Sequence, residues 1–377
     1  MRTLCVEGWR FLHHSYAVVN QWQLLSLLKR NDLSLSVRDV PYFHQEWTAR
    51  KGLFSPEQER RLESIPMLRP NEVTDATLRM SVPFDFSLRP KGRTVVFGTS
   101  EYKVVEERAR KAPPDIEQLS RSDFLLITPS RWSREGFLRL GIPDEQIAVI
   151  PHGVDPQTFR PTIEGKAARD AAKLPGFTFA NLSAMTDNKG IDLLLRAFLV
   201  VVEKHPDTRL LLKGSDDLYK SEGLLQRTIR GLPDGAANRL EGRIVYAGNA
   251  ATMDSVAIFY QLADAYVSPY RGEGFNLPVL EASACGTPVI CTKGGSTDDF
   301  MTEDTARFIE SRPAETVIRP GVGGFGLEPD LDHLIHLMFA VMEDTEWRAR
   351  AARVGPVRAA KEFSWDLAVE KLLHAIF

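Results

Sequence analysis

The sequence predicts an α/β protein made of two doubly wound, Rossmann-like domains that face each other across a cleft. The chain has 377 residues, which is too long for one compact core. Short apolar runs alternate with helical patterns along the chain, as is typical of parallel sheets covered by helices. A Pro- and Gly-rich stretch at 151–165, PHGVDPQTFRPTIEG, divides this alternation into two series. Because ligands bind beyond the carboxyl ends of such strands, the cleft is the expected site.

The first series contains three clearly marked strands. They are TVVFGT at 94–99, FLLIT at 124–128 and IAVIP at 147–151. A helix is expected from about Arg131 to Leu140, with Ser130 as its N-cap and Gly141 as its stop. Residues 40–90 are polar and broken by prolines, and an insertion over one lip of the cleft is expected there.

Two weaker strands are expected near Val37 and Thr77. In the second series, strands are expected in FTFANLSA, RLLLKG, RIVYAG, DAYVSPY and PVICT. The long helix GIDLLLRAFLVVVEKHP follows the first of these strands, and closing helices follow Pro329. This order again favours a parallel sheet.

Composition excludes several classes of function. Hydrophobic residues make up 43% of the chain and charged residues 26%, which is a globular profile. The net charge of −3 gives no overall positive field to recruit nucleic acid. No apolar run reaches the length of about eighteen residues that a membrane span needs, and the amino terminus lacks the shape of a signal peptide. The cysteines Cys5, Cys285 and Cys291 are expected to be buried, reduced thiols of a cytoplasmic protein.

The stretch RGEGFNLPVLEASACGTPVICTKGGSTDDF at 271–300 contains the residues best suited to ligand chemistry. It predicts a strand, a loop, a helix that begins near Leu277, and a second strand. Unpaired amides from Gly274 to the helix start would form an anion site suited to a diphosphate. Glu273 and Glu281 flank this site, and since carboxylates repel phosphate, both are expected to face hydroxyl pairs of a sugar or ribose. The ordinary alternative is a pair of solvated carboxylates at a helix start.

The segment EGFNLPVLEASACGTPVI, followed by GGS, resembles the E-x7-E signature of retaining family 4 glycosyltransferases, which have the GT-B fold. The resemblance continues in LLITPSRWSREGFLRLGIPDEQIAVIPHGVDPQTFRP and NKGIDLLLRAFLVVVEKHPDTRLLLKG, and it covers most of residues 120–300. It implies transfer of a sugar from a nucleoside-diphosphate sugar to an acceptor hydroxyl, in glycan, glycolipid or polysaccharide synthesis. It also implies an acceptor domain at 1–160, a donor domain at 161–345, and helices at 346–377 that cross back.

The resemblance assigns a role to each matching residue. Glu273 would contact the donor sugar, Glu281 the ribose hydroxyls, and Lys189 the diphosphate. Catalysis would depend on Lys189 because charge builds on the departing diphosphate. The remaining expected donor contacts are Gly274, Phe275, Asn276, Leu277, Arg271, Gly248 and Asn249.

One position departs from the family pattern. Where the family usually has a second cation, an arginine before the lysine, this chain has Ala184. Arg271 or Lys293 would replace that cation, or the diphosphate would be held more weakly, or the protein would be an inactive relative.

The amino-terminal half offers acceptor candidates. His14, Ser15 and Tyr16 fill the turn after the first strand, where the family has a Gly-rich loop near the acceptor. The alternative is helix capping by Ser15 with packed histidines. Glu101 occupies a loop where the family often has a histidine that faces the donor sugar, so it is a third catalytic candidate beside Lys189 and Glu273. A plain helix-start carboxylate is the alternative for Glu101, and a structural hinge role is expected for His152.

No cofactor and no essential metal are expected. Asp330 and Asp332 match an Asp-x-Asp metal motif, but they precede an amphipathic helix and are expected at its start. Three rival functions stay open, namely an inverting transferase with His14 or Glu101 as base, a nucleotide-sugar epimerase, and a non-catalytic nucleotide-sugar-binding protein. The expected partners are a nucleotide-sugar donor and a glycan or lipid-linked acceptor, without nucleic acid. Peripheral contact with the inner face of a membrane is included in this expectation.

Overall fold

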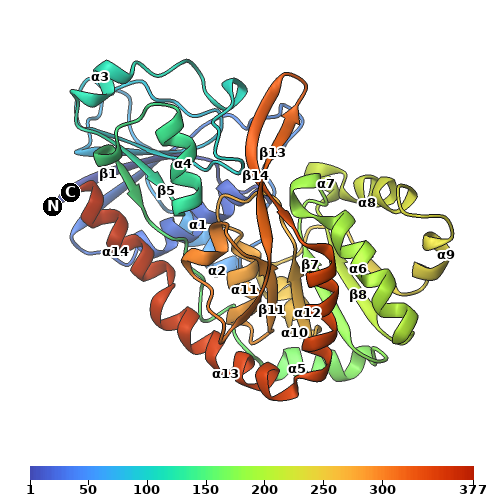
Figure 1. The fold of residues 1–377 in the computed structure, drawn as a ribbon. Helices are drawn as coiled ribbons and strands as arrows, with labels where there is room; N and C mark the ends of the chain where they lie inside the picture. The colour runs from blue at the N-terminus through green and yellow to red at the C-terminus, as the bar shows by residue number, and fades with distance from the viewer. The chain divides into compact units, whose positions relative to one another are not determined.

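The computed structural model describes residues 1–377 and contains two compact units, each built around a six-stranded parallel sheet (Figure 1). The first unit comprises Met1–Gly153, Val317–Gly324 and Phe363–Phe377. The second unit comprises Val154–Thr316 and Phe325–Glu362. Helices flank both sheets, so the predicted pair of Rossmann-like domains is confirmed.

The first unit has the strand order β2-β1-β3-β4-β5-β6. Its strands are β1 (Arg2–Gly8), β2 (Leu33–Asp39), β3 (Ala76–Met80), β4 (Arg93–Phe97), β5 (Phe124–Thr128) and β6 (Ile147–Val149). Its helices are α1 (Ser15–Leu27), α2 (Pro56–Glu63), α3 (Ile116–Ser120), α4 (Arg131–Arg139) and α14 (Trp365–Ile376). The expected strands near Val37 and Thr77 are therefore confirmed, as is the helix after Ser130, whose side chain accepts from the amide of Ser133.

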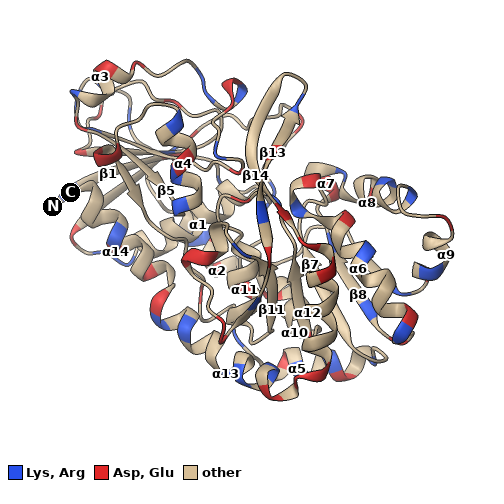
Figure 2. Ribbon diagram, viewed as in Figure 1, with Lys and Arg blue, Asp and Glu red and all other residues tan.

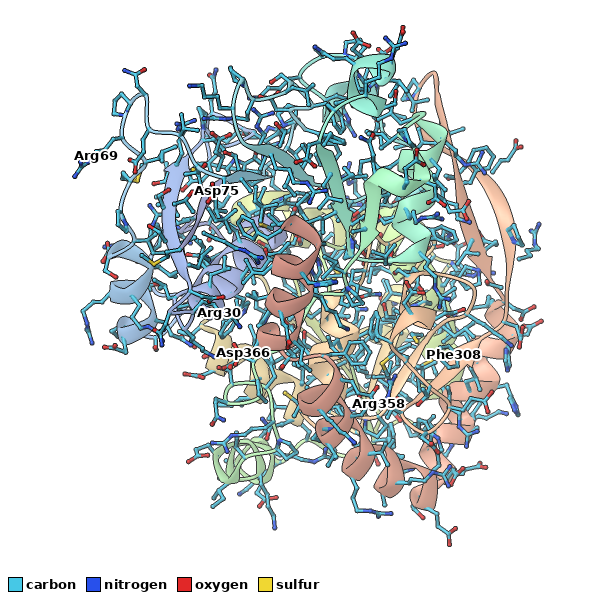
Figure 3. All side chains as sticks on the ribbon, turned by 90° about the vertical axis from the view of Figure 1, so that its left-hand side faces the viewer. Arg30, Arg69, Asp75, Phe308, Arg358 and Asp366 are labelled. Carbon is cyan, nitrogen blue, oxygen red and sulfur yellow. The ribbon has the colours of Figure 1, made fainter.

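Helix α14 packs on α1, although the two are far apart in sequence. Asp366, which is labelled in Figure 3, accepts hydrogen bonds from the Ser26 hydroxyl at 2.5 Å and from the Lys29 ammonium at 2.8 Å. At the other end of α1, the cap differs from the alternative considered for Ser15. His14 is the N-cap rather than Ser15, because its Nδ1 accepts from the amide of Tyr16 at 3.2 Å.

The second unit has the strand order β12-β11-β10-β7-β8-β9. Its sheet strands are β7 (Thr178–Leu182), β8 (Arg209–Lys213), β9 (Ile244–Ala247), β10 (Ala265–Ser268), β11 (Val289–Thr292) and β12 (Ala306–Ile309). Its helices are α5 (Ile163–Ala172), α6 (Ile191–Lys204), α7 (Asp216–Tyr219), α8 (Ser221–Arg230), α9 (Ala236–Leu240), α10 (Met253–Gln261), α11 (Leu277–Ala284), α12 (Leu331–Glu343) and α13 (Thr345–Glu362). A hairpin of β13 (Ser311–Arg319) and β14 (Val322–Pro329) was not predicted.

Burial of α6 stabilises the second unit. Leu194, Leu195 and Phe198 are fully buried in a cluster with strand residues such as Leu210 and Val267, and α6 also packs against α12. This explains the apolar run that marked the helix in the sequence. Because the core fixes the strands, the loops at their carboxyl ends have a rigid support.

Three further expectations concern the chain as a whole. All three cysteines are buried free thiols, as expected. None of the helices combines the length and the apolar character required to cross a bilayer. Acidic and basic residues are mixed over the surface of each unit, consistent with the small net charge of −3 (Figure 2).

Candidate active site

The predicted donor residues of the second unit follow the carboxyl ends of neighbouring parallel strands. Lys189 follows β7, Asn249 follows β9, and the loop from Arg271 to Asn276 follows β10. Since these three strands run parallel in one sheet, the loops share one edge. This is the edge at which open α/β sheets bind ligands.

Lys189 and Glu273 are in direct contact. The Lys189 Nζ lies 2.7 Å from the Glu273 Oε1, and the two side chains are only 15% and 13% exposed. Hydrogen bonds hold their loops together: the Asn188 side-chain amide donates to the Gly272 carbonyl at 3.0 Å, and the Arg271 backbone amide donates to the Asn188 carbonyl at 2.7 Å. The structure therefore brings together two of the three predicted catalytic residues.

The loop before α11 is held in a defined conformation. Asn276 adopts a left-handed conformation with φ of 73°, and its side-chain amide donates to the buried Ser268 hydroxyl at 2.9 Å. Phe275 stacks on Phe300 at 4.4 Å, and its carbonyl accepts from Ser296 at 3.1 Å. No side chain caps the amino end of α11, which starts at Leu277. A helix start without a side-chain cap leaves amides that an anion can satisfy.

Glu281 lies inside α11 and is buried, with 6% of its surface exposed. The Tyr260 hydroxyl, from α10, donates to its Oε2 at 2.7 Å. Burial raises the pKa of Glu281 to about 7, although the hydrogen bond from Tyr260 acts in the opposite direction. A carboxyl group of this kind is poised to accept hydrogen bonds from ligand hydroxyls, because these would replace solvation that it lacks.

The two candidate replacements for the missing cation at Ala184 both contact carboxylates. Arg271 makes two hydrogen bonds to Asp192, at 2.7 and 2.8 Å, and two to Glu328, at 3.1 and 3.4 Å. These bonds raise the pKa of the Arg271 guanidinium above its usual range, although burial opposes the rise. Lys293 is exposed, and its ammonium lies 3.3 Å from a carboxylate oxygen of Glu310.

A different cation, Lys213, was missed by the sequence analysis. It is the last residue of β8, and its ammonium donates to two backbone carbonyls, Gly214 at 2.7 Å and Asn249 at 2.6 Å. Burial lowers the pKa of Lys213, and the charges of Asp216 and Asp217 offset only part of this effect. The available signal was a lysine at the carboxyl end of an otherwise apolar strand.

Lys213 and Ala184 are neighbours at the carboxyl ends of the adjacent strands β8 and β7. The amide of Ser183 donates to the Lys213 carbonyl at 3.0 Å, and the Ser221 hydroxyl donates to the Ala184 carbonyl at 3.0 Å. On the β9 side, Gly248 lies so close to Asp216 that a side chain at this position would collide with the carboxylate. Because Lys213 bonds to Asn249 on one side and to Ser183 on the other, Gly248 and Asn249 lie at the same edge of the sheet as Ala184.

The first unit brings its own predicted residues together. The Tyr16 hydroxyl lies 3.0 Å from the Thr99 hydroxyl and accepts from the Thr99 amide at 3.0 Å. This joins the loop after β1 to the loop after β4, where Glu101 is exposed. Ser15 is also exposed at the start of α1, which leaves its hydroxyl open to a ligand.

His14 lies in an aromatic environment that the sequence did not indicate. Its ring contacts Trp9 and Trp47, each with a centroid separation of 5.2 Å. Burial, with a smaller effect of the His44 charge, lowers the pKa of His14 to about 4. His14 is therefore a neutral imidazole at pH 7.

Two residues set aside by the sequence analysis have structural roles. His152 is buried, packs against the rings of Phe97 and Trp365, and has its pKa lowered to about 3 by burial. Asp330 caps α12 by accepting from the amide of His333 at 2.8 Å, which confirms it as a helix-start residue. The structure contains no group of three His, Cys, Asp or Glu side chains arranged to hold a metal ion.

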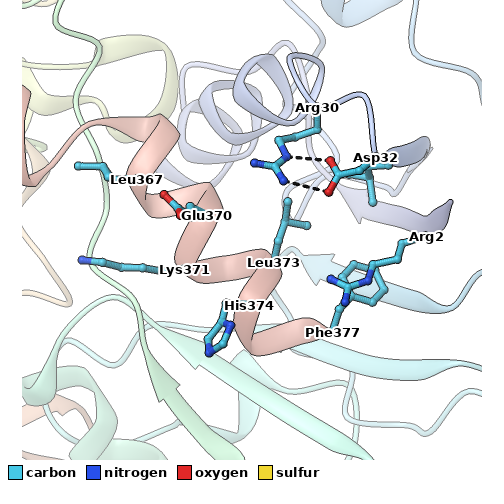
Figure 4. A pocket seen from close by; sticks show the side chains of 10 residues that line it. Arg2, Arg30, Asp32, Leu367, Glu370, Lys371, Leu373, His374 and Phe377 are labelled. Carbon is cyan, nitrogen blue, oxygen red and sulfur yellow. Dashed lines mark hydrogen bonds and ion pairs between the residues drawn. The ribbon is translucent and has the colours of Figure 1, made fainter.

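A surface groove of about 500 Å³ lies elsewhere in the first unit, between α14 and the start of β2 (Figure 4). Arg2, Leu33 and Leu373 are among its lining residues. It opens near the amino ends of β1 and β2. It is therefore remote from the edge of that sheet where Tyr16 and Thr99 meet.

Comparison with known proteins shows which class this chain resembles. Residues 176–319 match the family model "Glycosyl transferases group 1". The chain is 28% identical over 235 residues to a GDP-mannose-dependent monoacylated alpha-(1-6)-phosphatidylinositol monomannoside mannosyltransferase of Corynebacterium glutamicum, and the match covers 60% of this chain and 55% of that protein. It is also 29% identical over 313 residues to a D-inositol 3-phosphate glycosyltransferase of Nocardiopsis dassonvillei. That match covers 79% of this chain and 65% of the relative. The matches thus span between about half and two-thirds of these relatives.

The fold has a solved counterpart over its full length. The crystal structure of a glycosyltransferase from Rickettsia africae superposes with a TM-score of 0.71 at 16% identity, covering 100% of this chain and 98% of that one. At this identity the likeness shows the fold alone. The fold is the GT-B type that the sequence predicted, with two Rossmann-like units.

Proposed function

We propose that the protein is a retaining glycosyltransferase that moves a sugar from a nucleoside-diphosphate sugar to an acceptor hydroxyl. The main observation in support is the contact between Lys189 and Glu273 beside an α11 start that has no side-chain cap. The group 1 domain at 176–319 contains all of these residues. The relatives, by their printed names, transfer glycosyl groups, and one of them depends on GDP-mannose.

Donor binding follows from the chemistry of each group. The diphosphate would accept a hydrogen bond from the Leu277 amide at the start of α11, where the helix dipole also favours negative charge. Glu281 would accept from the ribose hydroxyls, and Glu273 from the sugar hydroxyls. Lys189 would then exchange part of its contact with Glu273 for the diphosphate, whose charge grows as the bond to the sugar breaks.

Lys213 is proposed as the second cation of the donor site, in place of the family arginine at Ala184. Arg271 is already neutralised by Asp192 and Glu328, whereas the Lys213 ammonium is bonded to backbone carbonyls. Carbonyls carry no net charge, so a phosphate oxygen would be a stronger partner for this partly desolvated ammonium.

At the acceptor, His14 has the low pKa of a hydrogen-bond partner rather than of an efficient base at neutral pH. This argues against His14 as the base of an inverting reaction, and it agrees with a retaining reaction in which the departing phosphate takes the acceptor proton. Charge on that phosphate would be met by Lys189, Lys213 and amides, so the reaction is proposed to be independent of metal. We place it in the cytoplasm, at the inner face of the membrane where the acceptor is lipid-linked.

Two measurements test the proposal. A thermal-shift screen of nucleoside diphosphates and their sugars should find a ligand that, at 100 times its Kd, stabilises the protein by about 2.7 kcal/mol. Incubation of that sugar nucleotide with acceptors, followed by NMR of the product anomer, should show the configuration of the donor. An inverted product would support the rival inverting mechanism, and binding without transfer or donor hydrolysis would support a non-catalytic protein. Conversion of donor without acceptor would support an epimerase.

A further inference from the structure

A row of charged side chains crosses three adjacent strands of the first unit at their carboxyl ends. Arg38 of β2 and Arg79 of β3 are the register partners of Glu7 on β1. Each of the three residues is the last but one of its strand. Because β2, β1 and β3 are neighbours in the sheet, the three side chains lie side by side at the edge where α/β sheets bind ligands.

A third arginine joins this row from the loop after β3. Arg89 donates to the Glu7 Oε1 at 3.1 Å, Arg79 donates to the Glu7 Oε2 at 3.2 Å, and Arg38 also forms an ion pair with Glu7. One carboxylate, itself only 10% exposed, therefore receives three guanidinium groups. We call Arg38, Arg79 and Arg89 the arginine triad.

The positive charge of the triad exceeds the negative charge that faces it. Glu7 supplies one negative charge against three positive ones. Asp85 also contacts Arg79, at 3.3 Å, but the charge of Asp85 is balanced by Lys111 at 2.9 Å, so the excess positive charge remains. The Nε of Arg89 is buried and has no hydrogen-bond partner. Guanidinium groups that are crowded together and incompletely bonded are stabilised by a further anion, and their planar forks match the oxygens of a phosphate.

The members of the triad differ in their other contacts and in their access to solvent. Arg79 is 11% exposed and holds the loop after β3, because its Nη1 donates to the carbonyls of Asp85 at 2.8 Å and Ser87 at 2.6 Å. Arg38 is 39% exposed and has no such loop contact. An anion would therefore reach the triad from the side of Arg38, while Arg79 keeps the loop in place.

We propose that the arginine triad is an anion subsite that binds a phosphate group on the acceptor. This inference rests on the proposed glycosyl transfer, and it narrows the acceptor to a phosphorylated sugar or polyol. The β1–α1 loop begins after Gly8, the residue next to Glu7, and leads to Ser15 and Tyr16, which links the subsite to the predicted acceptor residues. The phosphate would come from a free phosphomonoester or from a phospholipid headgroup, since both present the same oxygens.

Direct binding to the full chain tests the subsite. Glucose 6-phosphate and glucose would be titrated in parallel by calorimetry, and flotation would compare phosphatidylcholine vesicles with and without phosphatidylinositol. Arg38→Gln should weaken whichever phosphate ligand binds by about tenfold or more, the loss expected for one hydrogen bond between charged groups. The matched control is Arg30→Gln, because Arg30 is also ion-paired and is 43% exposed, but lies at the opposite edge of the sheet (Figure 4).

The outcomes distinguish a free phosphomonoester from a lipid headgroup as the source of phosphate. They also distinguish failure of the phosphate subsite from failure of the proposed glycosyl transfer. Binding of glucose 6-phosphate that depends on Arg38 but not on Arg30 supports the subsite with a free phosphomonoester. The same dependence for phosphatidylinositol vesicles alone supports it with a lipid headgroup. Phosphate binding that is unchanged by Arg38→Gln, or no phosphate binding at all, overturns it. Nucleotide binding by the second unit is read separately, so failure of the donor site and failure of the triad are distinguishable.

Discussion

The buried carboxyl of Glu281 makes the stability of the nucleotide-free protein depend on pH. Its pKa is raised from 4.5 to about 7 by burial. Between these two values the folded protein holds a proton that the unfolded chain has lost, so the free energy of unfolding falls as pH rises through this range. A difference of roughly 2.5 pKa units corresponds to about 3 kcal/mol, which is the full penalty above pH 7.

The substitution Glu281→Gln keeps the shape of the side chain and an oxygen for the Tyr260 hydroxyl, but it removes the charge. The variant should therefore gain up to about 3 kcal/mol over the parent at pH 8 and little at pH 4.5. Urea unfolding of both proteins at several pH values, followed by a signal from the second unit, measures this difference. Other titrating groups are the same in both proteins, so their contributions cancel in the difference between the two free energies of unfolding.

The variant Tyr260→Phe tests the direction in which the pKa of Glu281 moves. The hydrogen bond from Tyr260 lowers the pKa of Glu281, so its loss should move the pH dependence to higher pH. A difference between parent and Glu281→Gln that stays constant from pH 4.5 to 8 would refute the reasoning, as would a shift to lower pH in Tyr260→Phe. Nucleotide binding gives an independent check, because ribose hydroxyls favour the charged carboxylate. Calorimetry at pH 7 in buffers of different ionisation enthalpy should detect proton release in the parent and none in Glu281→Gln.

Four further outcomes are expected. Lys189→Ala should lower kcat by about 10²–10³ even at saturating donor, since the charge that it meets develops in the transition state, and a change within about threefold would contradict that role. Lys213→Met should weaken nucleoside-diphosphate binding by about tenfold, and Ala184→Arg should restore it in the double variant; an unchanged Kd in Lys213→Met would show that Lys213 is not the second cation. Glu273→Ala should spare binding of the nucleoside diphosphate, which lacks the sugar, while it depresses turnover of the sugar nucleotide; equal loss of both would argue against a sugar contact. Activity should survive EDTA, and complete loss restored by Mn²⁺ would reveal a metal requirement.

The sequence by itself determined most strands of the two sheets, their order and the main donor loop, but not β12 or the β13–β14 hairpin. Alternating apolar runs specify buried parallel strands because the side chains on both faces must be apolar. Gly, Asn and Pro between β10 and α11 specify a tight loop and a helix start, since each of them has a distinct backbone preference. For these reasons most of the sheet strands, helix α4 and the unit around Glu273 could be predicted.

Only the tertiary structure decided which charges meet. The pairs Lys189–Glu273 and Tyr260–Glu281 join residues that are 84 and 21 positions apart, and no local pattern encodes such distances. The same holds for Arg271, which looked like a ligand contact in the sequence but bonds to Asp192 and Glu328 in the fold.

The arginine triad and the hydrogen-bond partners of Lys213 could not be predicted from the sequence for the same reason. Arg38, Arg79 and Arg89 come from three separate segments and converge on Glu7 only when strand register is set. Local sequence fixes the conformation of each segment, because backbone preferences and the hydrophobic pattern act over a few residues. Electrostatic environment depends instead on burial and on partners supplied by distant strands, which exist only after the sheets have formed.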